Sequence, residues 1–365
     1  SFNAAQSFAT AIGAVVGSST GYTNFNGGIG TGGVDSQGFA QRITNAGNLT
    51  NIGSIQNGGI LSTAGGTFSA GTSYGTGANI RSITLGDLNG DGDKDIVTSN
   101  SASNTMTIYW GNGTGSFTSS STLATLTGPA QNNVADVNGD GKLDIVVNHN
   151  GTASVSVFLN SNGAFPTRAD YAVASTAGVS GGTGHIGIGD VNGDGKPDLV
   201  VPTSGGSFSV MRNNGDGTFA TKVDYSMGIA MVDVVLADLN GDGKADVVAG
   251  GGGSATIGVR MNNGDGTFGA VTSYVAGVSN LASALAAADF NNDGAVDIAV
   301  QNTNGNTVSV FMNTGNGTLA AKVDYTSSDG YGLAAVDVNG DGYVDLVPGI
   351  YATPSNGFAI LYNNG

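Results

Sequence analysis

One nine-residue pattern, D-x-N-x-D-G-x-x-D, constrains the fold of this chain more than any other feature. Its six copies recur roughly every 50 residues, beginning at Asp87, Asp136, Asp190, Asp238, Asp289 and Asp337. A period of this length is typical of four-stranded repeats that are arranged radially. The regular spacing therefore predicts a repeat protein made of β-sheets.

The residues around each copy indicate how the strands are laid out. An apolar, β-branched run follows the pattern, as in 145–147, and after a short polar turn an alternating segment such as 154–159 indicates a half-buried strand. A second signature, Asn-Gly-Asp-Gly in residues 214–217, predicts a tight hairpin. The strand that follows carries two large residues six positions apart, such as Phe219 and Tyr225. Each repeat is therefore predicted to be one four-stranded antiparallel blade of a β-propeller.

The two ends of the chain suggest how such a ring closes. A further large pair, Phe2 and Phe8, stands at the beginning, and the chain ends at Gly365, where another hairpin would continue. We therefore expect residues 1–9 to form the outer strand of the last blade, which removes the open sheet edges.

The segment before the first copy is interpreted as a degenerate blade without an acidic loop, covering residues 10–75. Residues 76–365 would then form six loop-bearing blades. The resulting prediction is one all-β domain over 1–365, a seven-bladed propeller closed by its N-terminal strand. The alternative is six blades, with residues 1–66 as a separate extension.

The nine-residue pattern also predicts a metal site. Side-chain oxygens at positions 1, 3 and 5 alternate around one point, Gly at position 6 permits a sharp turn, and the carbonyl of position 7 and carboxylate of position 9 complete the shell. All donors are hard oxygens, which favours Ca²⁺ over zinc or copper, and Mg²⁺ is a weaker alternative. We predict about six calcium ions. The predicted ligands are Asp87, Asn89, Asp91, Asp93 and Asp95 in the first copy; Asp136, Asn138, Asp140, Lys142 and Asp144 in the second; Asp190, Asn192, Asp194, Lys196 and Asp198 in the third; Asp238, Asn240, Asp242, Lys244 and Asp246 in the fourth; Asp289, Asn291, Asp293, Ala295 and Asp297 in the fifth; and Asp337, Asn339, Asp341, Tyr343 and Asp345 in the sixth.

Charge and composition exclude several classes of function. The net charge is −16, and only 11 Lys and Arg residues occur, scattered singly, which argues against nucleic-acid binding. All 27 acidic residues are Asp, and 19 of them lie in the predicted loops, so the acidity needs no basic partner. No run of about 18 apolar residues occurs, so no membrane span is expected. The chain begins with Ser rather than Met, which suggests that a targeting segment has been removed.

The loop and its period resemble the FG-GAP/VCBS repeats of bacterial surface proteins and the propeller of the integrin α-chain. The resemblance covers about residues 67–365, and it is nearer the VCBS type because literal Phe-Gly and Gly-Ala-Pro motifs are not clear. It implies calcium in the six loops, a secreted or cell-surface location, and a role in adhesion or in binding a glycan or protein. Some similar propellers are polysaccharide lyases, so the fold alone does not decide function.

Catalysis is not favoured by the residues that are present. The two histidines, His149 and His185, are expected on the face opposite the acidic loops, where a lyase could combine them with Arg81, Arg168 or Tyr171. We interpret both as surface loop residues and predict no enzyme, because no paired-carboxylate, serine-elbow or thiol site is visible. Trp110 is expected in the core. A subunit of an extracellular filament or surface layer stays open as an alternative to a ligand-binding propeller, since the N-terminal strand could insert into a neighbouring copy.

Overall fold

The computed structural model describes residues 73–173, 184–203, 205–252, 255–277, 281–303, 305–328, 330, 332–351 and 356–365, together with the backbone of five short strands before residue 51. The chain divides into two compact units, Ser1–Phe68 and Ser69–Gly365. The first unit contains a two-stranded and a three-stranded antiparallel sheet. Its strands are β1 (Ala14–Val16), β2 (Thr23–Phe25), β3 (Gly33–Val34), β4 (Ala40–Ile43) and β5 (Leu49–Thr50).

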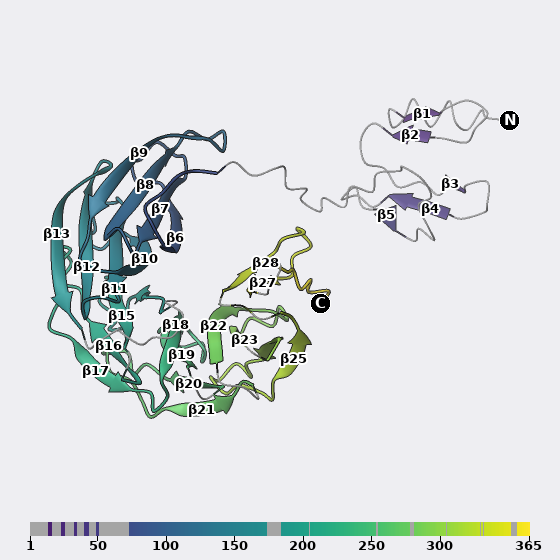
Figure 1. The fold of residues 1–365 in the computed structure, drawn as a ribbon. Coiled ribbons are helices and arrows are strands. Elements are labelled where there is room, and N and C mark those ends of the chain that lie inside the picture. The colour runs from purple at the N-terminus through teal and green to yellow at the C-terminus, as the bar shows by residue number, and fades with distance from the viewer. Residues whose placement is uncertain are drawn as a thin grey trace. The chain divides into compact units, whose positions relative to one another are not determined.

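The second unit contains six antiparallel sheets, one for each acidic pattern, and we call them blades 1 to 6 in chain order (Figure 1). Blades 1 to 5 have four strands, blade 6 has three, and the strands within each blade are consecutive in sequence. The strands are β6 (Ile80–Gly86), β7 (Asp95–Asn100), β8 (Thr105–Gly111) and β9 (Phe117–Ala124) in blade 1; β10 (Pro129–Ala135), β11 (Asp144–His149), β12 (Ser154–Ser161) and β13 (Ala164–Ala172) in blade 2; β14 (Gly187–Gly189), β15 (Asp198–Thr203), β16 (Ser207–Met211) and β17 (Val223–Ser226) in blade 3; β18 (Met231–Ala237), β19 (Asp246–Gly251), β20 (Thr256–Arg260) and β21 (Thr272–Val275) in blade 4; β22 (Leu281–Ala288), β23 (Asp297–Thr303), β24 (Thr307–Phe311) and β25 (Val323–Thr326) in blade 5; and β26 (Leu333–Val336), β27 (Asp345–Tyr351) and β28 (Asn356–Phe358) in blade 6.

The blades are held together by apolar layers between neighbouring sheets. In β11, Ile145 and Val147 pack into the cluster shared with blade 1, whereas Val146 packs into the cluster shared with blade 3. Successive side chains of a strand point to opposite faces, so a strand that is covered on both faces needs a continuous apolar run. This explains the β-branched run after every acidic pattern, and the same arrangement repeats through blade 6.

The predicted number of seven blades is wrong, because the described structure forms six. Within the segment 10–75, expected to be a degenerate blade, the described strands have two to four residues each and belong to the first unit, Ser1–Phe68. It lacks the acidic loop and the long apolar runs that give the other repeats two covered faces. The expected closing strand, residues 1–9, lies outside the described residues, and one domain over 1–365 stays a prediction.

In the described part of the chain, no helix is long and apolar enough to cross a membrane.

Candidate metal loops

The six acidic patterns all occupy the same place in their blades, the connection between the first and second strands. The loop of blade 3, for example, runs from Asp190, directly after β14, to Asp198, the first residue of β15. Position 9 is likewise the first residue of the second strand in every other blade. Strand topology therefore places all six loops at the same end of their sheets.

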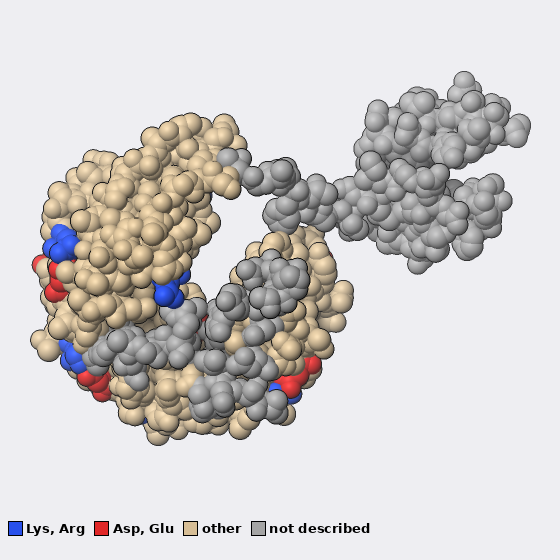
Figure 2. Space-filling model, viewed as in Figure 1, with Lys and Arg blue, Asp and Glu red and all other residues tan. Residues whose placement is uncertain are grey.

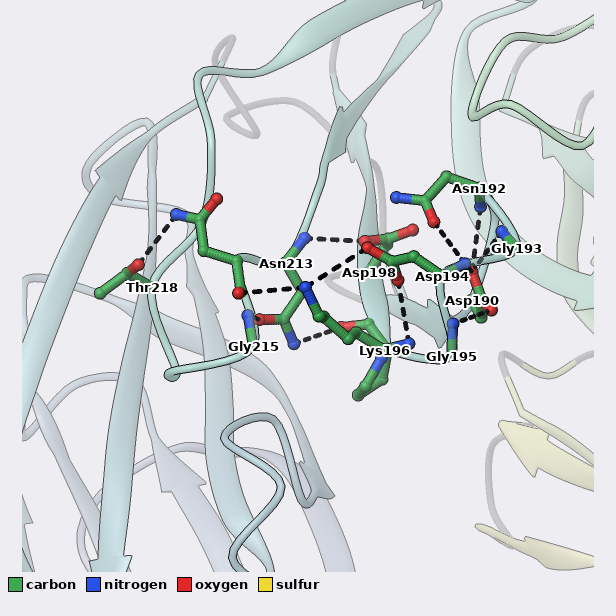
Figure 3. A network of polar contacts seen from close by, with 12 residues as sticks. Asp190, Asn192, Gly193, Asp194, Gly195, Lys196, Asp198, Asn213, Gly215 and Thr218 are labelled. Carbon is green, nitrogen blue, oxygen red and sulfur yellow. Dashed lines mark hydrogen bonds and ion pairs between the residues drawn. The ribbon is translucent and has the colours of Figure 1, made fainter.

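Each loop is folded around its own acidic side chains, as blade 3 illustrates (Figure 3). Asp190 accepts hydrogen bonds from the backbone N–H groups of Gly193 and Gly195, both at 2.7 Å. These two glycines have φ of +80°, a conformation that side chains with a Cβ rarely adopt. Asn192 Oδ1 accepts the N–H of Asp194 at 2.9 Å. The turn therefore depends on the predicted ligands and on both glycines.

Positions 5 and 7 follow the same rule in all six blades. The position-5 carboxylate accepts a hydrogen bond from the backbone N–H of position 7. This bond uses the N–H of position 7 and not its carbonyl, which is the predicted ligand. The position-7 donors are Asp93, Lys142, Lys196, Lys244, Ala295 and Tyr343.

The position-9 carboxylates are completely buried and fasten each loop to the rest of its blade. Asp198 accepts the N–H of Val191, inside its own loop, at 3.1 Å, and the N–H of Asn213, in the following hairpin, at 2.7 Å. The corresponding pair of bonds is present in every blade. Asp95, Asp144, Asp246, Asp297 and Asp345 are as buried as Asp198.

The loop carboxylates interact electrostatically. Burial raises the pKa of Asp198, backbone hydrogen bonds oppose this rise, and the negative charges of Asp194 and Asp190 add to it. The pKa values of Asp144, Asp246 and Asp297 are raised for the same reasons. The pKa of Asp190 is lowered, because four backbone N–H groups together outweigh the effect of its burial. Each loop is therefore a concentration of negative charge that a cation would relieve.

The donor set of each loop fits a hard divalent cation. It consists only of carboxylate, amide and carbonyl oxygens, and a carboxylate oxygen that accepts one N–H keeps a second lone pair. Within the described residues, however, no group of three or more Asp or His side chains lies close enough to hold a metal ion. Calcium in the loops therefore stays a prediction. In blade 3, Lys196 Nζ lies 3.6 Å from Asp194 Oδ2, with both side chains substantially exposed.

The repeat units match a known family model, described as an FG-GAP-like repeat, at residues 87–147, 136–201, 190–249, 238–300 and 289–347. Together these matches cover more than half of the chain. The chain belongs to the FG-GAP-like repeat family. This confirms the family and the propeller arrangement expected from the sequence, while the VCBS type stays a prediction.

Among solved structures, BBS1N in complex with ARL6DN is similar to this FG-GAP-like protein, with 14% identity and a TM-score of 0.55 over 79% of this chain and 80% of that chain. This likeness shows the fold alone. An Agrocybe aegerita lectin, whose structure is described as recognising non-reducing terminal N-acetylglucosamine, is 23% identical with a TM-score of 0.48, over 77% of this chain and 80% of that one. No curated protein sequence matches the chain.

Sequence reasoning missed the role of one hairpin residue in this FG-GAP-like propeller. Asn213 directly precedes the predicted hairpin turn at 214–217 and was given no role of its own, but its side chain is buried and its amide donates to the carbonyls of Val137 and Pro197. The signal that could have found it is the recurrence of Asn at this position in blades 2 to 6, including blade 2, where the hairpin sequence differs.

The two histidines lie at strand ends opposite the acidic loops, as their place in the strand order predicted. His149, the last residue of β11, is fully buried, so its interpretation as a surface loop residue was wrong. Its Nε2 lies 2.8 Å from Ser156 Oγ, which donates to Asp170. Along β11, His149 lies on the same face as Ile145 and Val147, which pack into the cluster shared with blade 1, so its side chain is turned toward that blade.

The suggested companions of the histidines are engaged in packing. Arg168 forms an ion pair with Asp170 at 3.1 Å and stacks over Phe158. The Tyr171 hydroxyl accepts the N–H of Phe219 in blade 3, and the two rings meet edge to face. Tyr171 therefore serves the packing of blade 2 against blade 3.

Trp110 packs against the apolar cluster between blades 1 and 2 and donates from Nε1 to Ser121. Trp110 is half-buried at the margin of this cluster rather than inside the core that was expected. Arg81 lies exposed on β6.

Proposed function

We propose that this FG-GAP-like propeller is a secreted or cell-surface binding module, stabilised by about six calcium ions, that recognises a glycan or protein and has no enzymatic activity. One observation carries the proposal. An all-oxygen acidic loop occupies the same connection in all six blades, and a buried carboxylate ties it to the following hairpin. The carboxylates of each loop repel one another, so the loop is costly without a cation. Its repetition at one structural position is therefore what a scaffold that depends on cations requires.

The location outside the cell follows from the same chemistry. Short oxygen loops of this kind suit the high calcium concentrations of extracellular fluid, where modest affinity is enough to keep them filled. Inside cells, the free calcium concentration would leave sites of modest affinity largely empty.

The ligand surface that we favour is the end of the blades opposite the acidic loops. The acidic loops repeat almost unchanged, whereas the connections at the opposite end differ between blades, as in 125–128 and 227–230. Variable loops on a rigid scaffold are a common site of recognition. Among the described residues in the view of Figure 2, few acidic side chains are visible. A surface with few carboxylates suits an uncharged, hydroxyl-rich or protein ligand better than a cationic one.

Two measurements test the proposal. Isothermal titration should detect calcium uptake of about six ions per chain, with a matching rise in the unfolding temperature. Glycan arrays and binding to extracellular polymers should then give signals in calcium that disappear in chelator. Absence of calcium uptake at millimolar concentration, or cleavage of an acidic polysaccharide by the protein, would contradict the proposal.

Self-association is a second candidate, favoured by the incomplete last blade. Within the described residues, blade 6 has three strands where the others have four, and Phe358 and Tyr362 near its outer edge are exposed. An exposed edge of this kind can accept a strand from another chain. Sedimentation analysis at several protein concentrations decides: a strictly monomeric protein rules this function out, and a concentration-dependent polymer supports it.

A further inference from the structure

Five asparagines at the start of the hairpin after the third strand form the same set of contacts in blades 2 to 6. Four of them are buried and the last is half-buried. The residues are Asn160, Asn213, Asn262, Asn313 and Asn363.

The side-chain amide of each asparagine donates both of its protons to backbone carbonyls. One acceptor lies in the preceding blade, on the second residue of its acidic loop, and the other precedes position 9 of the asparagine's own loop. For Asn213 the acceptors are Val137 at 2.8 Å and Pro197 at 2.9 Å. The acceptors in the preceding blades are Leu88 at 2.7 Å, Val137 at 2.8 Å, Val191 at 3.0 Å, Leu239 at 2.7 Å and Phe290 at 2.6 Å.

The backbone of the same asparagine contacts its own loop. The N–H of Asn213 donates to Asp198 Oδ1 at 2.7 Å, and Asp198 Oδ2 accepts the N–H of Val191 at 3.1 Å. The carbonyl of Val191 in turn accepts the amide of Asn262 in blade 4. One continuous chain of contacts therefore runs from the loop of blade 1 to that of blade 6. In each step, the position-9 carboxylate holds the second residue of its loop, and the carbonyl of that residue holds the asparagine of the next blade.

Blade 1 provides an internal comparison. Gly111 occupies the asparagine position there and keeps the N–H bond to Asp95 Oδ1 at 2.8 Å, but it has no side-chain amide. The sequence before blade 1 contains no acidic pattern. The asparagine is therefore present wherever an acidic loop precedes it, and absent from the one blade that none precedes. This distribution assigns the side chain to the preceding loop rather than to its own hairpin.

The hairpin itself does not require the asparagine. In blade 2 the turn is Asn-Ser-Asn-Gly, and Asn160 Oδ1 accepts the N–H of Gly163, three residues later. In blade 3, Asn213 Oδ1 accepts the N–H of Gly215, two residues later. The local turn differs, but the bond to the preceding loop is the same.

We propose that these asparagines are positioning residues that couple the six acidic loops, so that cation uptake by one loop depends on the docking of the following blade. This proposal rests on the proposed function, because it assumes that the loops take up calcium. The asparagine amide holds the carbonyl of the second loop residue in the preceding blade. The N–H of that same residue orients the position-9 carboxylate, which is a predicted calcium ligand. By reciprocity, an occupied loop strengthens the contact with the next blade.

The test uses the full chain and calcium itself as the probe. Asn213→Ala removes both carbonyl bonds, and Asn214→Ala is the matched control, because the Asn214 amide contacts only the exposed Thr218 hydroxyl among the bonds described. Calcium titration should show about a tenfold weaker affinity at one of the sites in Asn213→Ala, which corresponds to the loss of one or two hydrogen bonds. Asn214→Ala should bind as the unchanged chain does.

A double-mutant cycle assigns the effect to a loop. Asp140→Asn removes a predicted ligand from the loop of blade 2, which contains Val137, and Asp194→Asn does the same in blade 3. If Asn213 acts through the preceding loop, adding Asn213→Ala to Asp140→Asn changes the calcium titration no further, whereas adding it to Asp194→Asn still weakens a site.

The outcomes separate the coupling from the proposed function. No calcium uptake by the unchanged chain overturns both. Normal uptake by the unchanged chain, with an identical titration for Asn213→Ala, overturns the coupling alone, even if the variant is less stable in chelator. Should Asn213→Ala not fold, Asn363→Ala in the half-buried last position, with Asn364→Ala as its control, gives the same decision for the loop of blade 5.

Discussion

His185 and Asp233 join blades 3 and 4, with His185 Nδ1 lying 2.6 Å from Asp233 Oδ1. The Asp233 side chain is only 1% exposed, whereas that of His185 is 47% exposed. The other oxygen, Oδ2, accepts the N–H of Leu285 in blade 5 at 2.9 Å. One carboxylate therefore connects three blades at the end opposite the acidic loops, and this arrangement makes stability depend on the charge of a histidine.

Replacing His185 by Gln should change how stability depends on pH. The negative charge of Asp233 raises the pKa of His185, and burial only partly opposes this effect. Stability from the protonated ring is fully present below the unfolded pKa of about 6.5 and is lost as the pH rises through the higher folded pKa. The difference in unfolding free energy between the unchanged chain and His185→Gln should therefore shrink between pH 6 and pH 9 in urea titrations. A difference that is constant with pH would contradict the prediction.

His149 should have the opposite effect, at lower pH. Burial lowers its pKa to about 4, although the nearby Asp170 raises it somewhat. The neutral ring is favoured in the folded state, so its contribution is present above about pH 6.5 and is lost as the pH falls toward 4, by at most about 3 kcal/mol. His149→Gln should lose stability less steeply than the unchanged chain over this range of pH. Parallel curves for the two proteins would show that the ring does not titrate there.

Two substitutions in the loop of blade 3 should separate structure from calcium binding. Asp198→Ala leaves two buried N–H groups without their acceptor and should cost about 2–4 kcal/mol in chelator. The cost in calcium should be larger, because the same change removes a predicted calcium ligand. Asp194→Asn should keep its acceptor oxygen for Lys196 N–H, change stability in chelator by less than about 0.5 kcal/mol, and remove one bound calcium.

The control for this pair is Asp216→Asn, an exposed carboxylate in the next hairpin that accepts hydrogen bonds from Thr218. It should leave the number of bound calcium ions unchanged. Equal calcium stoichiometry in Asp194→Asn and Asp216→Asn would show that the loop of blade 3 is not a calcium site. Urea titrations and calorimetric calcium titrations give both quantities.

Gly111 should tolerate no side chain. A Cβ there would lie 2.2 Å from the carbonyl oxygen of Lys94, a backbone atom that cannot move aside cheaply. Gly111→Ala should therefore lower the unfolding free energy by about 1–3 kcal/mol. Gly75→Ala is the matched control, since a Cβ there meets nothing within 4 Å, and it should be neutral within about 0.5 kcal/mol. Equal stability of the two variants in urea would contradict the close approach.

Local sequence was a good guide to the repeat but not to the number of blades. The apolar run around Val146 indicated a strand, and the structure shows that both of its faces are covered, because successive side chains of a strand point to opposite faces. The pair Phe2 and Phe8 predicts a strand but not its partner, since pairing across hundreds of residues depends on long-range contacts that a local pattern does not contain. The expected seven blades were wrong at a different place, residues 10–75, whose described strands form small sheets of two and three strands rather than a four-stranded blade.

The burial of single polar residues was equally invisible in the sequence. His149 lies between two Asn residues and close to a glycine, which indicates a surface loop, yet its side chain is buried on the face of β11 that packs toward blade 1. The importance of Asn213 was missed because its partner, Val137, lies 76 residues away in another blade.

By itself, the sequence determined the features that local chemistry controls. These are the six acidic turns, in which short carboxylates and glycines such as Gly195 must occur at set spacings, and the strands whose alternation follows from the backbone. Only the tertiary structure decided how many sheets stack, that His149 is buried, and that Asn213 connects one loop to the next. Those features depend on contacts between segments far apart in the chain, and a repeated local pattern carries no information about which copies meet.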